Sequence, residues 1–200
     1  QAEALRAVAS ALSEKTKLVA LSHIQYTCGL RMPIKEISVA AHEMGIPVLV
    51  DGAQSVGQVQ VDIKDLGCDF YALSGQKWLM GPGGTGALYV LKERRAVVEP
   101  LFTTNVLEAN RQTDRLPLAR FSLVSQSPGL LAGLLESIHI ATDIGIRQIE
   151  QRAMDLADLL RERCSPIEGC NLLSPMAPES ACGLVTIGLK DWPPAELVTA

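Results

Sequence analysis

The sequence lacks the features that mark several classes of protein. Its 18 basic and 22 acidic residues give a net charge of −4, so it has no basic surplus of the kind that binds nucleic acid or an anionic membrane surface. No apolar run approaches the roughly 20 residues that a membrane-spanning helix needs. No signal peptide is visible at the start of the chain. We therefore expect neither a nucleic-acid partner nor a membrane partner.

The cysteines and histidines also lack the spacing of structural sites. The 5 cysteines are odd in number and widely spaced, and no two form a CxxC motif, which argues against a disulfide framework or a thiolate zinc site. The 3 histidines make no metal-ligand spacing. We expect no metal, and a reducing cytoplasm as the location. The chain also lacks an initiator Met and begins and ends in helical patterns, so we expect a piece of a longer protein.

The sequence does contain short apolar runs that alternate with helical patterns. Hydrophobic residues make up 48% of the chain, which is enough for one sizeable core. Each expected strand is apolar on both faces, which favours an α/β fold with a mainly parallel sheet and flanking helices. The expected strands are 17–22, 47–51, 69–74 and 86–91, and the expected helices are 2–13, 34–44 and a short helix or turn at 61–66.

The second part of the chain has a different pattern. Residues 128–163 predict two helices, or one helix broken near Asp143 to Gly145. Strand-like segments follow at 171–173 and 183–187. We therefore expect a large domain at 1–145, and a connecting helix with the start of a smaller α/β domain at 146–200.

Polar residues follow three of the expected strands. Ser22 and His23 end the first strand, Asp51 ends the second and Ser74 ends the third. Ligands gather at the carboxyl ends of parallel strands, so these residues predict a binding site at one edge of the sheet. His23 is a candidate for proton transfer there, although an isolated histidine is more often structural.

Lys77 lies between the third strand and a glycine-rich loop. A lone lysine in such a place is usually a surface residue, but Asp51 precedes it by about one strand-to-strand repeat, so the two can occupy neighbouring strand ends. A nucleophilic lysine needs a lowered pKa, and pyridoxal phosphate (PLP) needs a carboxylate that keeps its ring nitrogen protonated. Lys77 and Asp51 together therefore predict a PLP site.

Three further residues suit the same cofactor. Gln54 can donate a hydrogen bond to a phenolic oxygen, and Ser74 and Gln76 can donate to a phosphate. Simpler roles remain open: Asp51 could cap a helix just after it, Gln54 could be a solvated turn residue, and Ser74 could cap the loop. The loop does not match a nucleotide P-loop, because Lys77 precedes most of the glycines.

Three motifs in order connect these residues to a known family. They are Ser-His-Ile-Gln-Tyr-Thr-Cys-Gly at 22–29, Val-Leu-Val-Asp-Gly-Ala-Gln-Ser-Val-Gly at 48–57 and Asp-Phe-Tyr-Ala-Leu-Ser-Gly-Gln-Lys-Trp-Leu-Met-Gly-Pro-Gly-Gly-Thr-Gly at 69–86. Together they resemble the class V aminotransferases, which include cysteine desulfurases, selenocysteine lyases and cysteine or cystine C–S lyases. The resemblance implies a PLP enzyme of fold type I that acts on an amino acid and is usually a homodimer.

The resemblance also implies a role for each candidate residue. Lys77 matches the lysine that holds the cofactor as a Schiff base, and Asp51 matches the carboxylate on the pyridine nitrogen. Gln54 matches the residue near the phenolic oxygen, and Ser74 matches a phosphate ligand. Ser125 matches a position, commonly Thr, that reaches the phosphate in the neighbouring subunit.

The chain departs from the family pattern at two positions. Gln76 stands where a histidine often precedes the lysine, and Tyr26 stands where desulfurases often have Asn. The family's persulfide-forming cysteine and its arginine for the substrate carboxylate normally follow residue 200, so none of the 5 cysteines is assigned that role. A cysteine desulfurase or C–S lyase-like enzyme is the leading interpretation. The alternatives are an aminotransferase, an epimerase, a kynureninase-like hydrolase, or a non-catalytic module or inactive fragment with this fold.

Overall fold

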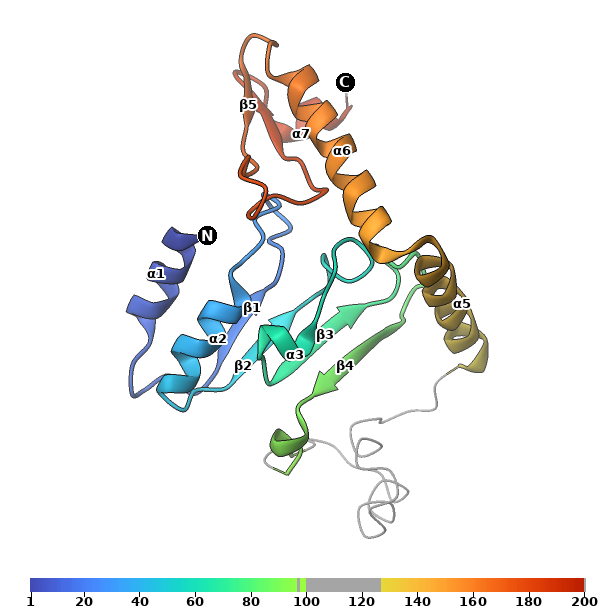
Figure 1. Cartoon of the computed structure of the whole chain (residues 1–200). Coiled ribbons are helices and arrows are strands. Elements are labelled where there is room, and N and C mark those ends of the chain that lie inside the picture. Colours follow the sequence, from blue (N-terminus) through green and yellow to red (C-terminus); the bar gives the residue numbers. More distant parts are fainter. Residues whose placement is uncertain (97, 100–126, 200) are drawn as a thin grey trace.

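The main layer of the protein is a four-stranded sheet (Figure 1). The computed structural model describes residues 1–96, 98–99 and 127–199. The first three strands of the sheet are parallel, and β4 pairs with β3 in the antiparallel direction. The strands lie in the order β1 (Val19–Ser22), β2 (Val48–Asp51), β3 (Phe70–Ser74) and β4 (Gly86–Val90).

The mainly parallel sheet expected from the sequence is confirmed, and the direction of β4 has a simple cause. A parallel connection needs a crossover of a dozen or more residues, usually a helix. Each of the connections from β1 to β2 and from β2 to β3 contains a helix, whereas residues 75–85 between β3 and β4 form turns without one.

Helix α2 (Ile34–Glu43) covers one face of the sheet and buries its apolar side against it. Ile34, Ile37 and Ala41 recur at helical spacing and are at most 1% exposed. α1 (Ala2–Ala11) lies beside α2, and α3 (Ile63–Leu66) is a single turn. The buried cluster between these helices and the sheet consists of Val19, Ile34, Ile37, Ala41, Ile46, Val48, Val50, Cys68 and Tyr71.

The end of α2 shows why the chain turns back into the sheet at this point. Gly45 has a φ of +70°, a left-handed conformation that glycine adopts without steric cost. Its N–H bonds to the carbonyl of His42, and the N–H of Ile46 bonds to the carbonyl of Ala41. This pair of bonds is the Schellman arrangement, which satisfies the last carbonyls of the helix.

A buried carboxylate ties the amino-terminal ends of the strands together. Asp69 is 1% exposed. Its Oδ1 accepts from Arg94 Nε at 2.6 Å, and its Oδ2 accepts from His42 Nε2 at 2.8 Å and from the Val48 N–H at 2.7 Å. Burial favours the neutral acid, but the bonds from His42, Arg94 and Val48 outweigh it and leave the pKa of Asp69 below its usual value.

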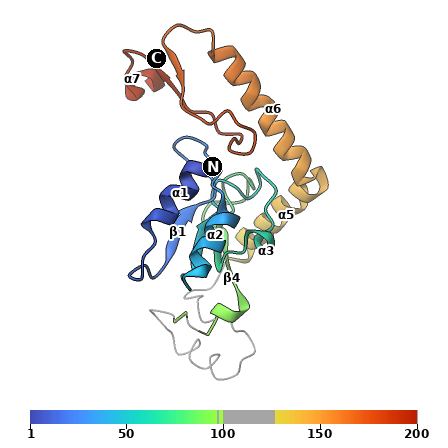
Figure 2. The same ribbon diagram turned by 60° about the vertical axis from the view of Figure 1, so that its left-hand side comes forward.

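The second part of the chain leaves the sheet along two long helices (Figure 2). α5 (Pro128–Ile144) and α6 (Ile146–Cys164) meet at Gly145 and are bent by 79° relative to each other. α6 leads to a two-stranded antiparallel sheet of β5 (Cys170–Leu172) and β6 (Ile187–Leu189), followed by α7 (Pro194–Thr199). The division into domains at 145/146 stays a prediction.

The strand expected at 183–187 is wrong in its position. β6 begins only at Ile187. Residues 182–184 instead pack on the main sheet's loops, where Ile24, Val59 and Cys182 form a second buried cluster. Within the described part of the chain, no single helix is long and apolar enough to span a membrane, although the bent pair of α5 and α6 passes that test together.

We expect Asp69→Asn to lower the free energy of unfolding by about 2–4 kcal/mol, because it removes the charge of a buried carboxylate that accepts three hydrogen bonds, two of them part-buried. Because the folded-state pKa of Asp69 lies below the unfolded value of about 3.9, its contribution is present above that pH and is lost as the pH falls through the folded-state pKa. Urea unfolding of both proteins between pH 7 and pH 2 measures this.

The matched control is Asp65→Asn, which breaks the exposed pair between Asp65 and Lys35. Exposed pairs contribute about 0–1 kcal/mol, so the control should unfold close to the wild type at every pH. Equal stability of the Asp69 and Asp65 variants would contradict the role assigned to Asp69.

Candidate functional site

A cavity of about 260 Å³ lies at the carboxyl ends of β1 and β2, next to the loop that follows β3. This is the sheet edge at which the sequence predicted a binding site. This volume lies just below the range of about 300–1,000 Å³ that is typical of small-molecule pockets. The lining residues are Ser22, Ile24, Tyr26, Asp51, Ala53, Gln54 and Lys77.

The register of the strands brings Asp51 to this edge. Asp51 pairs with Ser22 across β1 and β2, and its carbonyl accepts the His23 N–H at 2.8 Å. The Asp51 side chain is exposed, and its Oδ1 accepts the Ala53 N–H at 2.9 Å. Residues 53–55 form turns, so Asp51 caps a turn and not the helix considered as its simpler role. Its Oδ2 remains as an acceptor for a ligand.

Two glycines allow the turn after β2 to lie directly against its neighbours. A Cβ atom on Gly52 would stand 2.1 Å from the ring of Tyr71. A Cβ atom on Gly57, whose φ is +90°, would stand 2.6 Å from the backbone of Trp78 and Leu79. Any side chain at either position would therefore push the turn away from β3 or from the Lys77 loop.

Lys77 lies in a series of turns after β3, and these turns hold its backbone. The side chain of Lys77 is exposed and lines the cavity. The Met80 N–H bonds to the Lys77 carbonyl at 2.9 Å, and the Gly75 N–H bonds to the Thr85 carbonyl at 2.8 Å. Beside Lys77, the indole N–H of Trp78 donates to Gln54 Oε1 at 3.0 Å. The loop after β3 and the turn after β2 are thus bonded to each other next to the lysine.

His23 is buried at the same edge but is absent from the residues that line the cavity of Lys77. It is 2% exposed, and its Nδ1 lies 2.9 Å from the Tyr71 hydroxyl, which in turn lies 2.6 Å from Ser55 Oγ. Burial and then the nearby Arg31 cation lower the pKa of His23 to about 4, so its ring is neutral near pH 7. The geometry supports a role in holding Tyr71 and the turn that carries Asp51.

The remaining candidates lie around the cavity, not in its lining. Ser74 is half-buried at the end of β3, and Gln76 is exposed on the loop that follows. Ser125 lies outside the described residues. Among the residues that line the cavity, the sequence patterns did not select Ser22 and Tyr26 as ligands, although both belong to the first family motif. Among the described residues, no three His, Cys, Asp or Glu side chains gather into a metal site.

The donor set of the cavity fits PLP. A primary amine from Lys77 and a carboxylate from Asp51 line the same space, as required for a covalent link to the cofactor and for a partner to its ring nitrogen. The amide of Gln54 can donate to an oxygen on the ring, because its Oε1 already accepts from Trp78 and its NH₂ group is left as the donor.

Comparisons with known proteins agree with this chemistry. The model of the family described as aminotransferase class-V matches residues 2–200. The chain is 36% identical over 197 residues to a probable cysteine desulfurase of Halalkalibacterium halodurans, covering 96% of this chain and 47% of that protein. It is 31% identical over 201 residues to the isopenicillin N epimerase of Streptomyces clavuligerus, covering 94% and 50%.

A solved structure has the same fold. The cystine C–S lyase C-DES, solved in complex with its reaction product cysteine persulfide, superposes with a TM-score of 0.80 at 26% identity, covering 93% of this chain and 51% of that one. The chain therefore spans about half the length of the curated relatives and of the solved structure that it matches.

We expect the ring protons of His23 to titrate with a midpoint near pH 4 in the folded protein. The cause is the cost of placing an imidazolium in a buried site next to Arg31. An NMR titration measures this, with the His23 signal assigned from a His23→Gln variant. The urea-unfolded protein is the reference, in which the midpoint should return to about 6.5. A folded-state midpoint near 6.5 would mean that the ring is not buried as described.

Proposed function

We propose that this chain, which belongs to the class-V aminotransferase family, supplies about half of a PLP-dependent enzyme that acts on an amino acid. Enzymes of this family depend on PLP. The observation that carries the proposal is the meeting of Lys77, Asp51 and Gln54 in one cavity at the strand ends. The chain spans about half the length of its relatives. The activity of the whole protein is therefore proposed, together with the cofactor site in this half.

When bound, the cofactor supplies an electron sink for negative charge at the substrate's α-carbon. We assign Lys77 to hold the cofactor and then to move the α-proton, because its amine lines the cavity. Asp51 keeps the proton on the ring nitrogen through charge, and the Gln54 NH₂ donates to the phenolic oxygen. Ser74 and Gln76, and Ser125 outside the described residues, are proposed phosphate ligands.

His23 has a different proposed role. Its neutral, buried ring contacts Tyr71, which fills the space beside Gly52. We therefore assign His23 to positioning the turn that carries Asp51, in place of a direct transfer of protons to the substrate.

The reaction we propose is cleavage of a carbon–sulfur bond in a sulfur amino acid, as in a cysteine desulfurase or C–S lyase. The support is the similarity to a probable cysteine desulfurase and to the cystine C–S lyase C-DES. The similarity to isopenicillin N epimerase favours a second candidate, epimerisation at an α-carbon. Release of sulfide or persulfide from cysteine or cystine supports the first, and inversion of the α-carbon without such release supports the second.

Two further properties are proposed for the whole protein. We propose a homodimer, because the family resemblance implies it and because α5 exposes six large apolar side chains that a partner would cover, namely Leu130, Leu131, Leu135, Ile138, Ile140 and Ile144. The molar mass in solution tests this. We propose a reducing compartment such as the cytoplasm, because all 5 cysteines are free thiols.

We expect Lys77→Ala in the full-length protein to abolish the covalent cofactor adduct, because Lys77 supplies the only amine that lines the cavity among the described residues. Borohydride reduction followed by peptide mass spectrometry should find the cofactor on Lys77 in the wild type and on no lysine in the variant. The control is Lys64→Ala on the exposed part of α3, which should keep the adduct. An adduct at another lysine in the Lys77 variant would overturn the assignment.

We expect Asp51→Asn to slow exchange of the substrate's α-hydrogen with solvent by about 100-fold or more. The neutral amide cannot hold the ring proton electrostatically, and the loss of such a group at a reacting centre has about this size. NMR detection of exchange in D₂O measures the rate. Asp155→Asn on the exposed face of α6 is the control and should exchange like the wild type. An unchanged rate in the Asp51 variant would exclude the role given to Asp51.

A further inference from the structure

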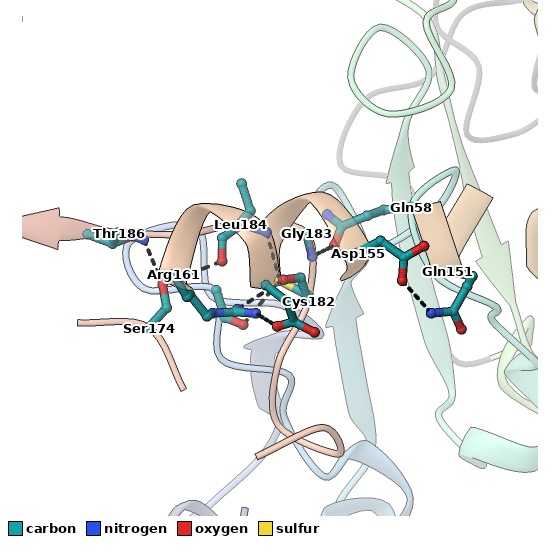
Figure 3. Close-up of polar contacts among 11 residues, drawn as sticks. Gln58, Gln151, Asp155, Arg161, Ser174, Cys182, Gly183, Leu184 and Thr186 are labelled. Carbon is teal, nitrogen blue, oxygen red and sulfur yellow. Dashed lines mark hydrogen bonds and ion pairs between the residues drawn. The ribbon is translucent and has the colours of Figure 1, made fainter. Parts of the chain in front are cut away.

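Gln58 is a fully buried amide whose two ends bond to different parts of the chain. It is 0% exposed. Its Nε2 donates to the Gln54 carbonyl at 2.9 Å. Its Oε1 accepts the Gly183 N–H at 2.8 Å (Figure 3). Gly183 lies 125 residues further along the chain, so this side chain connects the segment after β5 with the turn that borders the cavity.

The chemistry of the partners dictates how both glutamines are oriented. A backbone N–H only donates and a carbonyl only accepts, so Gln58 must turn its Oε1 toward Gly183 and its Nε2 toward Gln54. The indole N–H of Trp78 also only donates, so Gln54 must turn its Oε1 toward Trp78. The NH₂ group of Gln54 is therefore the end left for the cavity, beside Lys77.

The segment 182–184 is packed tightly enough to hold Gln58 in place. A Cβ atom on Gly183 would stand 3.0 Å from the Ala153 Cβ, 3.3 Å from the ring of Trp78 and 3.4 Å from Gln58 Oε1. A side chain at this position would require these neighbours to shift by a few tenths of an ångström.

The residue before Gly183 is anchored on both sides. Cys182 is 0% exposed, and its Sγ donates to the Gly29 carbonyl at 3.1 Å. Its own carbonyl accepts from Arg161 of α6 at 3.3 Å (Figure 3). The loop that contains Gly29 also carries Tyr26, which lines the cavity. The segment 182–184 thus bonds to the loop that carries Tyr26 and to the turn that carries Gln54. It also lies against Trp78 in the loop of Lys77 itself.

We propose that Gln58 is a positioning residue for the cofactor site. It links the backbone of Gln54 to segment 182–184 and so fixes the position of that residue. From this position the Gln54 side chain, bonded to Trp78 through its Oε1, turns its NH₂ toward the ring oxygen of the cofactor. This inference rests on the proposed function, because it assigns the group toward which Gln54 is held. Segment 182–184 acts through Gln58 and Trp78 and does not itself line the cavity.

The test compares Gln58→Leu and Gln58→Glu with the wild type in the full-length protein. Gln58→Leu removes both bonds of the Gln58 side chain, so the turn of Gln54 loses its link to segment 182–184. Above the absorbance midpoint we expect the Kd for PLP to rise about tenfold, the size of the one hydrogen bond that Gln54 would lose to the ring oxygen. The pH midpoint of the bound cofactor's absorbance should also rise by about one unit, because a donor at the ring oxygen favours the form that has lost its proton.

Gln58→Glu is the conservative variant, and its behaviour should depend on pH. The protonated acid can donate to the Gln54 carbonyl and accept from Gly183, whereas the carboxylate places a charge against that carbonyl. The Kd of this variant, relative to the wild type at the same pH, should therefore approach 1 in acid and rise as the pH rises. For Gln58→Leu the same ratio should change only across the cofactor's own midpoint, by the factor of about ten that a shift of one unit in that midpoint requires.

Gln151→Glu is the matched control, because Gln151 makes a single exposed bond to Asp155 on α6 (Figure 3). Its Kd and absorbance midpoint should equal those of the wild type. Thermal unfolding of each protein without PLP separates positioning from stability. Gln58 variants that unfold earlier but keep the wild-type Kd and midpoint would overturn this inference and leave the proposed function intact. A wild-type protein that binds no PLP would overturn the proposed function itself.

Discussion

The close approach of the turn after β2 to the loop after β3 is the constraint on which the site depends. Parallel β2 and β3 bring Asp51 and the Lys77 loop to one edge of the sheet. Gly57 lets the backbone of Trp78 come within the space that a Cβ atom would occupy. The bond from Trp78 to Gln54 then closes the contact. Without this approach, the amine and the carboxylate would not line one cavity.

Two buried polar groups support this edge from different sides. One fills space and the other joins two segments through hydrogen bonds. The ring of Tyr71, bonded to His23 and Ser55, fills the space beside Gly52 and fixes the base of the turn. Gln58 ties the far end of the same turn to the segment after β5. In both cases the buried polar atoms are bonded, because an unpaired one would cost more than the bond provides.

Several features could be predicted from particular residues. Val19, Val48 and Val50 indicate buried strands. The positions of Asp51 and Ser74 at strand ends follow from the alternation of strands and helices. The failures have local causes. The strand expected at 183–187 is displaced because Cys182 and Gly183 bond to the loops of the main sheet, an interaction that no local apolar pattern encodes.

By itself, the sequence determined the fold class, the family and the residue types of the site, because these depend on periodicity and on motifs that are local in the chain. The tertiary structure alone decided which side chains meet. It separated His23 from the cavity by turning its ring to Tyr71, and it added Tyr26 to the lining. Which side chains meet depends on contacts between residues far apart in sequence. Steric fit and hydrogen-bond pairing determine these contacts only once the chain is folded.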